Sequence, residues 1–289
     1  PATPTSLGTV YGYTTSGTGN VSVGYCSGNT TSTGYGNIAI GSNSLSTNTT
    51  GVYNIAIGCN SLYNNTIGYG NIAQGYQSLY NNTTGCNNIA IGNLSLRLNT
   101  TGECNLAIGN ETLVNNTTGS NNIAQGHGAM SNNTTGSGNI AIGSNALYNN
   151  TTGPQNVAIG SCALYSNKNG YWNSAFGIEA LYSNTAGSVN VAVGQSALHN
   201  NTTGILNVAV GYNALYNIIT GSNNVAVGNS AGGDIRSDNN ILIGNQAGYY
   251  ITTGGNNTVI GKLPGTQSME CTLLLGTGEC ERVKVDNTG

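Results

Sequence analysis

The sequence contains very little charge. Charged residues make up 5% of the 289 positions, and the formal net charge of −3 is spread over the whole length. Lysine and arginine number six and form no cluster, so the basic surface that nucleic-acid binding needs is missing. Low charge does not indicate disorder here, because apolar residues are plentiful and fall on a regular period. We therefore expect a folded protein that does not bind nucleic acid.

Long apolar runs are also missing. No run approaches the roughly 18–20 residues that a membrane-spanning helix requires, so we expect no membrane insertion. The first five residues, Pro-Ala-Thr-Pro-Thr, lack the charged and then apolar pattern of a signal segment. Two interpretations of this start stay open: a leader has been removed, or the chain is exported or packaged without one.

The usual motifs of catalysis and metal binding are lacking as well. The two histidines, His127 and His199, lie at different positions of distant repeats, which predicts neither a metal site nor a catalytic triad. None of the seven cysteines forms a CxxC pair. Cys271 and Cys280 are close enough in sequence to form a disulfide, and the alternative is that the cysteines are free, half-buried thiols. We expect no cofactor.

What the chain contains instead is one short unit, repeated. The pentapeptide Asn-Ile-Ala-Ile-Gly begins at Asn37 and returns in related form every 17 residues. Self-similarity at a fixed short period is the signature of a solenoid. The later copies begin at Asn54, Asn71, Asn88, Asn105, Asn122, Asn139, Asn156, Asn173, Asn190, Asn207 and Asn224, and weaker copies begin at Asn20, Asn240 and Asn257.

Each unit predicts β-structure. Ile-Ala-Ile alternates with a period of two and is rich in β-branched residues, which favours a strand. Ala-Leu-Tyr predicts a second, shorter strand, and the glycine between the two permits a positive φ or a sharp corner. Asn-Asn-Thr-Thr-Gly consists of residues that favour turns, so it predicts a turn. Stacked coils would pair in parallel at about 4.8 Å each, so the fifteen copies predict a rod roughly 70 Å long.

The fold class predicted from this pattern is all-β: a parallel β-solenoid of 17-residue coils. We divide the chain into a lead-in or cap (1–19), the repeat solenoid (20–262) and a degenerate repeat with a C-terminal cap strand (263–289). In the last segment Val283 and Val285 alternate with Arg282 and Lys284, which predicts a half-exposed final strand that covers the open end of the solenoid.

Both faces of the main strand are apolar, one lined by isoleucine or valine and the other by alanine. A strand that is apolar on both sides is buried on both sides, yet a single thin coil can cover only one. One face must therefore fill the coil and the other must meet another chain. Gln74 and Gln125, on the aliphatic face, would pair across a symmetry axis or line a narrow wet core. We assign eight isoleucines to the structural core, with one leucine per coil completing the interior: Ile38, Ile40, Ile55, Ile57, Ile89, Ile91, Ile140 and Ile142, with Leu45, Leu62, Leu79, Leu147 and Leu215.

Two further columns of residues are candidate sites. The first is aromatic, with His199 filling one gap: its rings would contact a glycan or receptor, or simply stabilise one another across the sheet. The second consists of asparagines that form either a hydrogen-bonded amide ladder or N-glycosylation sites. The aromatic members are Tyr63, Tyr80, Tyr148, Tyr165, Tyr182 and Tyr216, and the asparagines are Asn82, Asn116, Asn133, Asn150 and Asn201.

Carboxylates do not recur with the repeat, so a calcium-binding roll is not expected. Asp234 and Asp238 flank Arg236 in the one irregular 16-residue step, and we interpret them as a loop salt bridge rather than as a glycosidase pair. A polysaccharide-active enzyme on a parallel β-helix would need clustered carboxylates, so we expect the protein not to be an enzyme.

The string Gly-Asn-Ile-Ala-Ile-Gly-x-x-Ala-Leu-Tyr-x-Asn-Thr-Thr-Gly resembles repeats of phage and giant-virus tail-fibre or surface-fibre proteins. It is also similar, with a longer coil here, to the head repeats of YadA-like trimeric autotransporter adhesins. The closing residues 281–289 resemble the stretch that follows such repeats in tail fibres. The resemblance covers roughly residues 20–289. It implies a left-handed, trimeric parallel β-roll that serves as a fibre or adhesin head.

The expected function is thus a structural fibre or adhesin segment, extracellular or on a virion surface, that takes part in host attachment. The expected partners are further copies of the chain, in a homotrimer, and a glycan or protein receptor on the host surface. The alternative is the subunit of an extracellular filament in which solenoids stack end to end, a contact that does not close on itself.

Overall fold

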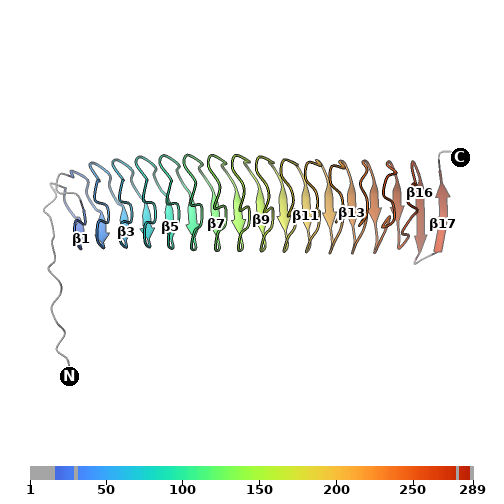
Figure 1. Cartoon of the computed structure of the whole chain (residues 1–289), viewed down its shortest axis with the longest axis horizontal. Helices are drawn as coiled ribbons and strands as arrows, with labels where there is room; N and C mark the ends of the chain where they lie inside the picture. Colours follow the sequence, from blue (N-terminus) through green and yellow to red (C-terminus); the bar gives the residue numbers. More distant parts are fainter. Residues whose placement is uncertain (1–16, 29–31, 278–279, 287–289) are drawn as a thin grey trace, which may run out of the picture. The chain divides into compact units, whose positions relative to one another are not determined.

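The computed structural model describes residues 17–28, 32–277 and 280–286 (Figure 1). It divides into two compact units, residues 1–137 and 138–289, which are taken separately below. The described residues contain strands, turns and bends but no helix, so the all-β prediction is confirmed. The strand-like sequence at 9–12 lies outside the described residues.

Unit 1 is a parallel β-solenoid with one three-residue strand per coil. Each strand pairs in register with its copy in the next coil, as Ile38 does with Ile55 and Ile55 with Ile72. The weak copy at Asn20 belongs to the same sheet, since Val21 pairs with Ile38. The strands are β1 (Val21–Val23), β2 (Ile38–Ile40), β3 (Ile55–Ile57), β4 (Ile72–Gln74), β5 (Ile89–Ile91), β6 (Leu106–Ile108) and β7 (Ile123–Gln125).

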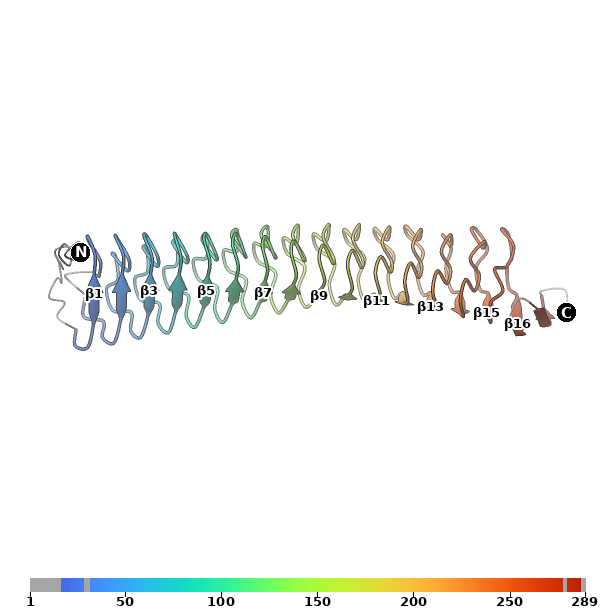
Figure 2. The ribbon, with the colours of Figure 1, turned by 90° about the horizontal axis from the view of Figure 1, so that it is seen from below.

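Unit 2 continues the same architecture and ends differently. Its parallel strands are again in register, and the shortened step keeps that register because Val225 pairs with Ile241. Figure 2 shows the strands of each unit side by side, with the rest of each coil looping away from them. The strands are β8 (Ile140–Ile142), β9 (Val157–Ile159), β10 (Ser174–Phe176), β11 (Val191–Val193), β12 (Val208–Val210), β13 (Val225–Val227), β14 (Ile241–Ile243), β15 (Thr258–Ile260), β16 (Leu273–Thr277) and β17 (Cys280–Val285).

The glycine after each strand makes the corner that the sequence predicts. Gly58 has a φ of +131°, and a Cβ placed on it would lie 2.5 Å from the carbonyl oxygen of Gly75 in the next coil. Coils stacked at strand spacing leave no room for a side chain here. The position therefore requires glycine for its φ and also for the close approach of the neighbouring backbone.

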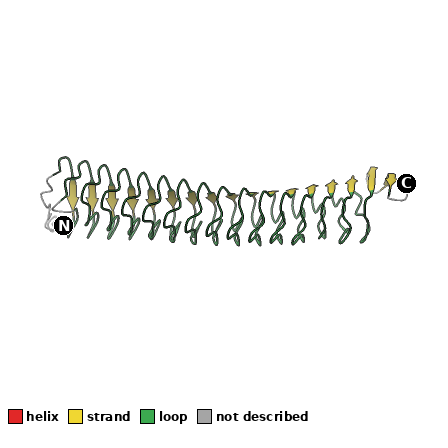
Figure 3. Ribbon diagram, turned by 90° about the horizontal axis from the view of Figure 1, so that it is seen from above, coloured by secondary structure: helices red, strands yellow, loops and turns green. Residues whose placement is uncertain are grey.

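The second strand expected at Ala-Leu-Tyr is not formed; this segment is a turn (Figure 3). Asn60 and Leu62 have φ values of 57° and 48°, and positive φ at alternate residues is incompatible with an extended strand. The backbone still bonds between coils: the amide of Leu62 donates to the carbonyl of Ser78 at 3.0 Å. Leu62 is fully buried, and that burial offsets the roughly 1–2 kcal/mol that a left-handed residue costs.

The interior of most coils is filled by alanine, leucine and asparagine. The strand alanines, such as Ala56 and Ala192, are completely buried, as are the turn leucines Leu62 and Leu215. In most coils the strand contributes the small residue and the turn the large one; at β14 the two are exchanged, since the buried Leu242 lies against Gly248. The leucine prediction is confirmed.

The isoleucines assigned to the core lie instead on the outer face of the sheet, half-buried or exposed, because the inward positions of the strands are taken by alanine. They are Ile38, Ile40, Ile55, Ile57, Ile89, Ile91, Ile140 and Ile142. Gln74 and Gln125 are exposed on the same face, so within one chain they do not line a wet core.

The C-terminal strand β17 pairs antiparallel with β16, with Val283 opposite Leu275 and a register shift after Leu275. It covers the hydrogen-bonding edge of the last parallel strand, as predicted. Its six residues are all exposed rather than half-exposed, because it pairs only along its backbone edge with β16.

Candidate functional surfaces

The outer face of the sheet carries two columns of mostly large apolar side chains, from the first and third residues of each strand. In unit 2 the third residue of most strands is 36–41% exposed, and each contacts its copies above and below. A contiguous apolar surface of this length is unusual on a monomer and is typical of an interaction site. The third strand residues with this exposure in unit 2 are Ile142, Ile159, Phe176, Val193, Val227, Ile243 and Ile260.

The aromatic residues predicted to form a column do stack. In unit 2, Tyr148, Tyr165, Tyr182, His199 and Tyr216 follow one another with ring centroids 5.0–5.4 Å apart and planes within 18° of parallel. In unit 1, Tyr63 and Tyr80 stack at 5.2 Å. We call the five-ring column of unit 2 the aromatic ladder.

Within the aromatic ladder each interior ring has both faces covered by its neighbours. A sugar therefore has access to ring edges only, whereas binding by stacking needs an open face. Mutual stabilisation, worth about 0.2–1 kcal/mol per cross-strand pair, accounts for the interior rings. The two end rings, Tyr148 and Tyr216, are stacked on one face only.

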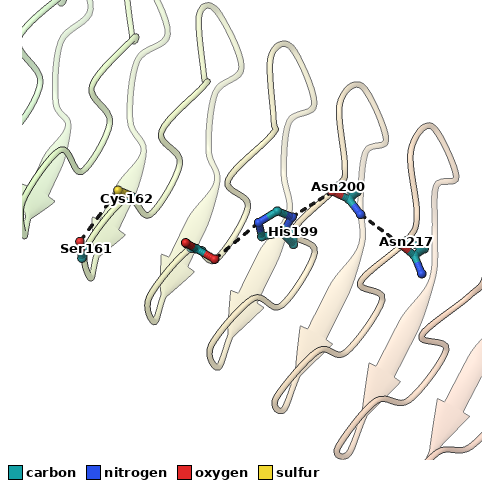
Figure 4. Close-up of polar contacts among 6 residues, drawn as sticks. Ser161, Cys162, His199, Asn200 and Asn217 are labelled. Atoms are coloured by element: carbon teal, nitrogen blue, oxygen red, sulfur yellow. Dashed lines mark hydrogen bonds and ion pairs between the residues drawn. The ribbon is translucent and has the colours of Figure 1, made fainter.

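The outer tips of ladder residues meet polar side chains from the preceding coil. The Nε2 atom of His199 lies 3.6 Å from Oε2 of Glu179 (Figure 4), and Nε of Arg97, at the same repeat position in unit 1, donates to Oε1 of Gln77 at 3.0 Å. Both pairs span 20 residues. Partial burial, together with Tyr165, Cys162 and Glu179, raises the pKa of Tyr182 above its ordinary value.

The candidate asparagines form an amide ladder inside the coils. Nδ2 of Asn82 donates to Oδ1 of Asn65 at 2.8 Å and to the carbonyl of Gly85 at 2.9 Å. A fully buried amide nitrogen that makes two hydrogen bonds is not accessible for glycan attachment. The five candidates Asn82, Asn116, Asn133, Asn150 and Asn201 are all completely buried.

A second amide ladder runs along the start of the strands, where the sequence predicted only strand register. Oδ1 of Asn37 accepts from the backbone amide of Asn54 at 2.9 Å, and Nδ2 of Asn54 donates to the carbonyl of Gly68 at 2.8 Å. The signal was present, because every copy of the pentapeptide begins with asparagine. Within each unit, and up to Asn201 in unit 2, neighbouring coils are thus bonded through two columns of buried amides besides the backbone.

An exposed apolar cluster at the corner before the strands of unit 2 was also missed. Tyr171 and Trp172 pack edge to face at 5.2 Å, and Trp172, Val189 and Leu206 occupy one repeat position in successive coils. All three have positive φ, between 54° and 61°, and are 37–58% exposed. Most other coils place glycine or asparagine at this position, as at Gly138 and Asn223.

The histidines and carboxylates considered from the sequence do not form a joint site among the described residues. His127 is exposed, and the described residues contain no group of three histidines, cysteines or carboxylates that could hold a metal ion. The salt bridge interpreted at Arg236 is not formed: Asp234 accepts from Asn217 at 2.8 Å, and Asp238 accepts from the amide of Ser222 at 2.7 Å. Both carboxylates thus accept hydrogen bonds from the preceding coil.

The cysteines are free, including Cys271 and Cys280, which are both exposed. The disulfide considered for that pair is therefore not formed. Nor does the described part of the chain contain a helix with the length and apolar character that a membrane crossing needs.

Comparison of the chain with protein-family models, with curated proteins and with solved structures gives no match in any of the three. Its function is therefore inferred from its own residues.

Proposed function

We propose that the chain is a structural segment of a fibre or adhesin, extracellular or on a virion surface, where it projects or forms a receptor-contacting rod. One observation carries this proposal: each unit presents an unpartnered column of aliphatic side chains along its sheet. Burying that column against other copies removes it from water at every coil, and apolar burial is the dominant favourable term in association.

The assembly we propose is a homotrimer in which the aliphatic faces of three chains meet around a common axis. The resemblance of the repeat to trimeric β-rolls suggests this number and a left-handed coil. Gln74 and Gln125 fit the arrangement, because amides at equivalent positions of three chains can bond to one another across an axis.

A mechanical rather than catalytic role suits the way the coils are joined. Backbone bonds and buried asparagines link neighbouring coils within a unit, and stacked rings add to them in some coils. Such a solenoid resists local opening because one coil cannot unfold without breaking its bonds to its neighbours. The contact with a host glycan or protein receptor then falls to surface rings and corner residues such as Trp172.

The filament alternative is less well supported. End-to-end stacking needs an open parallel edge at the C-terminal coil, and β17 occupies that edge with antiparallel pairing. Arg282 and Lys284 on β17 are exposed, and charged side chains on an edge strand oppose further strand addition. A C-terminal edge covered by β17 therefore agrees better with a closed oligomer than with a filament.

To test the proposal, apolar residues of the outer face are replaced with glutamine, which the chain already carries there at Gln74 and Gln125. Replacing Ile142, Ile159 and Phe176 together with glutamine removes apolar surface without introducing a residue foreign to this position. The matched control replaces Thr135, Thr152 and Thr203, exposed loop residues, with glutamine. Sedimentation equilibrium is expected to show dissociation to monomers for the outer-face variant and an unchanged oligomer for the loop variant. Equal behaviour of the two variants would contradict the proposal.

A further inference from the structure

The last coil of unit 2 is covered on its strand side only. In the earlier coils each turn is bonded to the turn of the next coil, as the amide of Thr252 is to the carbonyl of Gln267 at 3.0 Å. After the turn at 262–270 the chain forms β16 and then β17, which pairs with the free edge of β16. Figure 1 shows β17 as a strand beside β16, whereas each coil before β16 adds a loop to its strand. Among the described residues, therefore, no further turn is stacked on the last one.

A cavity of about 250 Å³ lies between this last turn and β17. A cavity of about 150 Å³ is enough to hold a benzene ring, so there is room here for an apolar group together with a small polar head. The two most buried lining residues, Leu263 and Leu274, are each 5% exposed. The lining also includes Pro264, Met269, Glu281 and Lys284. The cavity thus combines a buried apolar part with one acidic and one basic side chain.

Both charged residues lie on the inner face of the sheet, where the other strands of unit 2 carry apolar residues. In β8–β15 the middle residue of the strand is a buried alanine, leucine or valine, and Leu274 takes this place in β16. Lys284 lies directly opposite Leu274, and Glu281 lies opposite Gly276. Residues directly opposite in an antiparallel pair share a face, and positions 274 and 276 share a face because strand residues alternate. Lys284 and Glu281 therefore both face the cavity.

The register shift between β16 and β17 determines which charges reach the cavity. Val283 lies opposite Leu275. Regular pairing would then place Arg282 opposite Gly276, and the shift places Glu281 there instead. A bulge of this kind changes which side chain faces the interior. The cavity consequently receives one cation and one anion, where unshifted pairing would give it two cations.

The two charges do not neutralise each other. Among the described residues no ion pair joins Glu281 to Lys284, whose partners on β16 are two residues apart, about 7 Å along the strand. Nζ of Lys284 lies 3.9 Å from Oδ2 of Asp286, with both side chains partly exposed, and a solvated pair at this distance contributes little. An ammonium group has three donors, so Lys284 can bind a further anion. A ligand that carries both signs of charge would satisfy Glu281 and Lys284 together.

We propose that this cavity binds a free α-amino acid with an apolar side chain, such as leucine. Its ammonium group donates to Glu281 and its carboxylate accepts from Lys284, and such charge-assisted hydrogen bonds are the strong ones. Its side chain contacts Leu263 and Leu274, which removes apolar surface from water. An apolar amine or an apolar carboxylate fits less well, because each leaves one of the two charges without a partner. The proposal does not depend on the oligomer, since the cavity lies on the inner side of the sheet.

The test compares leucine with three probes that each lack one of its groups. Leucinamide lacks the carboxylate, N-acetyl-leucine lacks the ammonium group, and glycine lacks the apolar side chain. Saturation-transfer NMR on the full chain measures the affinity of each. Leucine is expected to bind at least tenfold more tightly than any of the three. This comparison uses the unmodified chain, so its result does not depend on whether a variant folds.

Two variants then assign the charged groups. Glu281→Gln is expected to weaken leucine binding at least tenfold and to abolish the preference for leucine over N-acetyl-leucine. Lys284→Gln is expected to give the same loss and to abolish the preference over leucinamide. The matched control is Arg282→Gln, which removes a charge from β17 at a residue that does not line the cavity and is expected to leave binding unchanged.

Three results would overturn the proposal. The first is absence of leucine binding to the unmodified chain. The second is equal affinity for leucine, leucinamide and N-acetyl-leucine, which would mean that the cavity takes apolar groups without regard to charge. The third is a loss in Arg282→Gln as large as the loss in Glu281→Gln and Lys284→Gln, which would mean that the position of the charge on β17 does not matter.

Discussion

The side-chain oxygen of Asn201 has no hydrogen-bond partner, because the residue one coil further on, where the amide ladder would continue, is Ile218. The ladder runs through Asn167 and Asn184 to Asn201 with Nδ2 to Oδ1 distances of 2.8–2.9 Å. Ile218 is itself fully buried. A ladder of this polarity leaves one acceptor unpaired at its C-terminal end wherever it stops.

Because the amide ladder ends in an unpaired acceptor, we predict that the loss of stability depends on where in the ladder an asparagine is replaced. Asn201→Ile moves the unpaired oxygen from Asn201 to Asn184 and leaves their number unchanged, so we expect a loss of about 1 kcal/mol. Asn167→Ile removes the bond that Asn167 donates to Oδ1 of Asn150 and the acceptor that Asn184 uses, so we expect a loss of about 2–4 kcal/mol. Urea unfolding followed by circular dichroism measures the difference. Equal destabilisation would show that the amides do not act as a ladder.

The corner before the strand predicts a stabilising substitution. Val189 has a φ of 61°, which a β-branched residue adopts only at a cost of roughly 1–2 kcal/mol, and asparagine occupies the same position at Asn223. Val189→Asn is expected to stabilise the chain by about 1 kcal/mol in thermal or urea unfolding. The reverse exchange, Asn223→Val, should destabilise by a similar amount. A Val189→Asn variant less stable than the parent would mean that the exposed valine makes a favourable contact.

Two glycines allow the cost of a positive φ to be measured apart from the cost of a steric clash. A Cβ at Gly194 meets the carbonyl oxygen of Gly211 at 2.5 Å, whereas at Gly138 the nearest atom is Cγ of Gln155 at 3.4 Å. Both glycines have positive φ. Gly138→Ala should cost about 1 kcal/mol, from φ alone, and Gly194→Ala should cost considerably more because two backbones must separate. Similar unfolding midpoints for the two variants would be inconsistent with this packing.

The raised pKa of Tyr182 predicts a loss of stability in alkali. Since the folded-state pKa lies above the ordinary value of 10.0, the folded state holds this proton more tightly than the unfolded chain does. The stabilisation is complete below pH 10 and is lost as the pH rises through the folded-state pKa. Tyr182→Phe should make unfolding less sensitive to pH above 10. Titration of phenolate absorbance should show one fewer late-titrating tyrosine in the variant.

The repeat made the strand and its partners predictable, because a period of 17 with Ile-Ala-Ile in each copy allows few arrangements other than stacked coils. The Ala-Leu-Tyr segment was mispredicted, since the left-handed conformation of Leu62 is stabilised by burial and leaves no trace in local propensity. The orientation of the strand was mispredicted as well. Both faces are apolar, so alternation alone did not distinguish the interior, and the narrow coil selected alanine.

The candidate site was predictable in part. Tyrosine at a 17-residue spacing indicated stacked rings, and their geometry follows from coil stacking. The apolar cluster at Trp172 was not predicted, because most coils carry glycine or asparagine at this repeat position, and only the structure shows that the larger side chains there are exposed.

The central claim is that the aliphatic outer face of the sheet meets other copies of the chain. Its most direct test is the mass of the unmodified protein in solution, measured by sedimentation equilibrium across a hundredfold range of concentration. We predict a single species of three times the 29.3-kDa chain mass. A series of larger species whose mass increases with concentration would favour the filament. A stable 29.3-kDa monomer, with Ile142 and its neighbours in water, would contradict the claim.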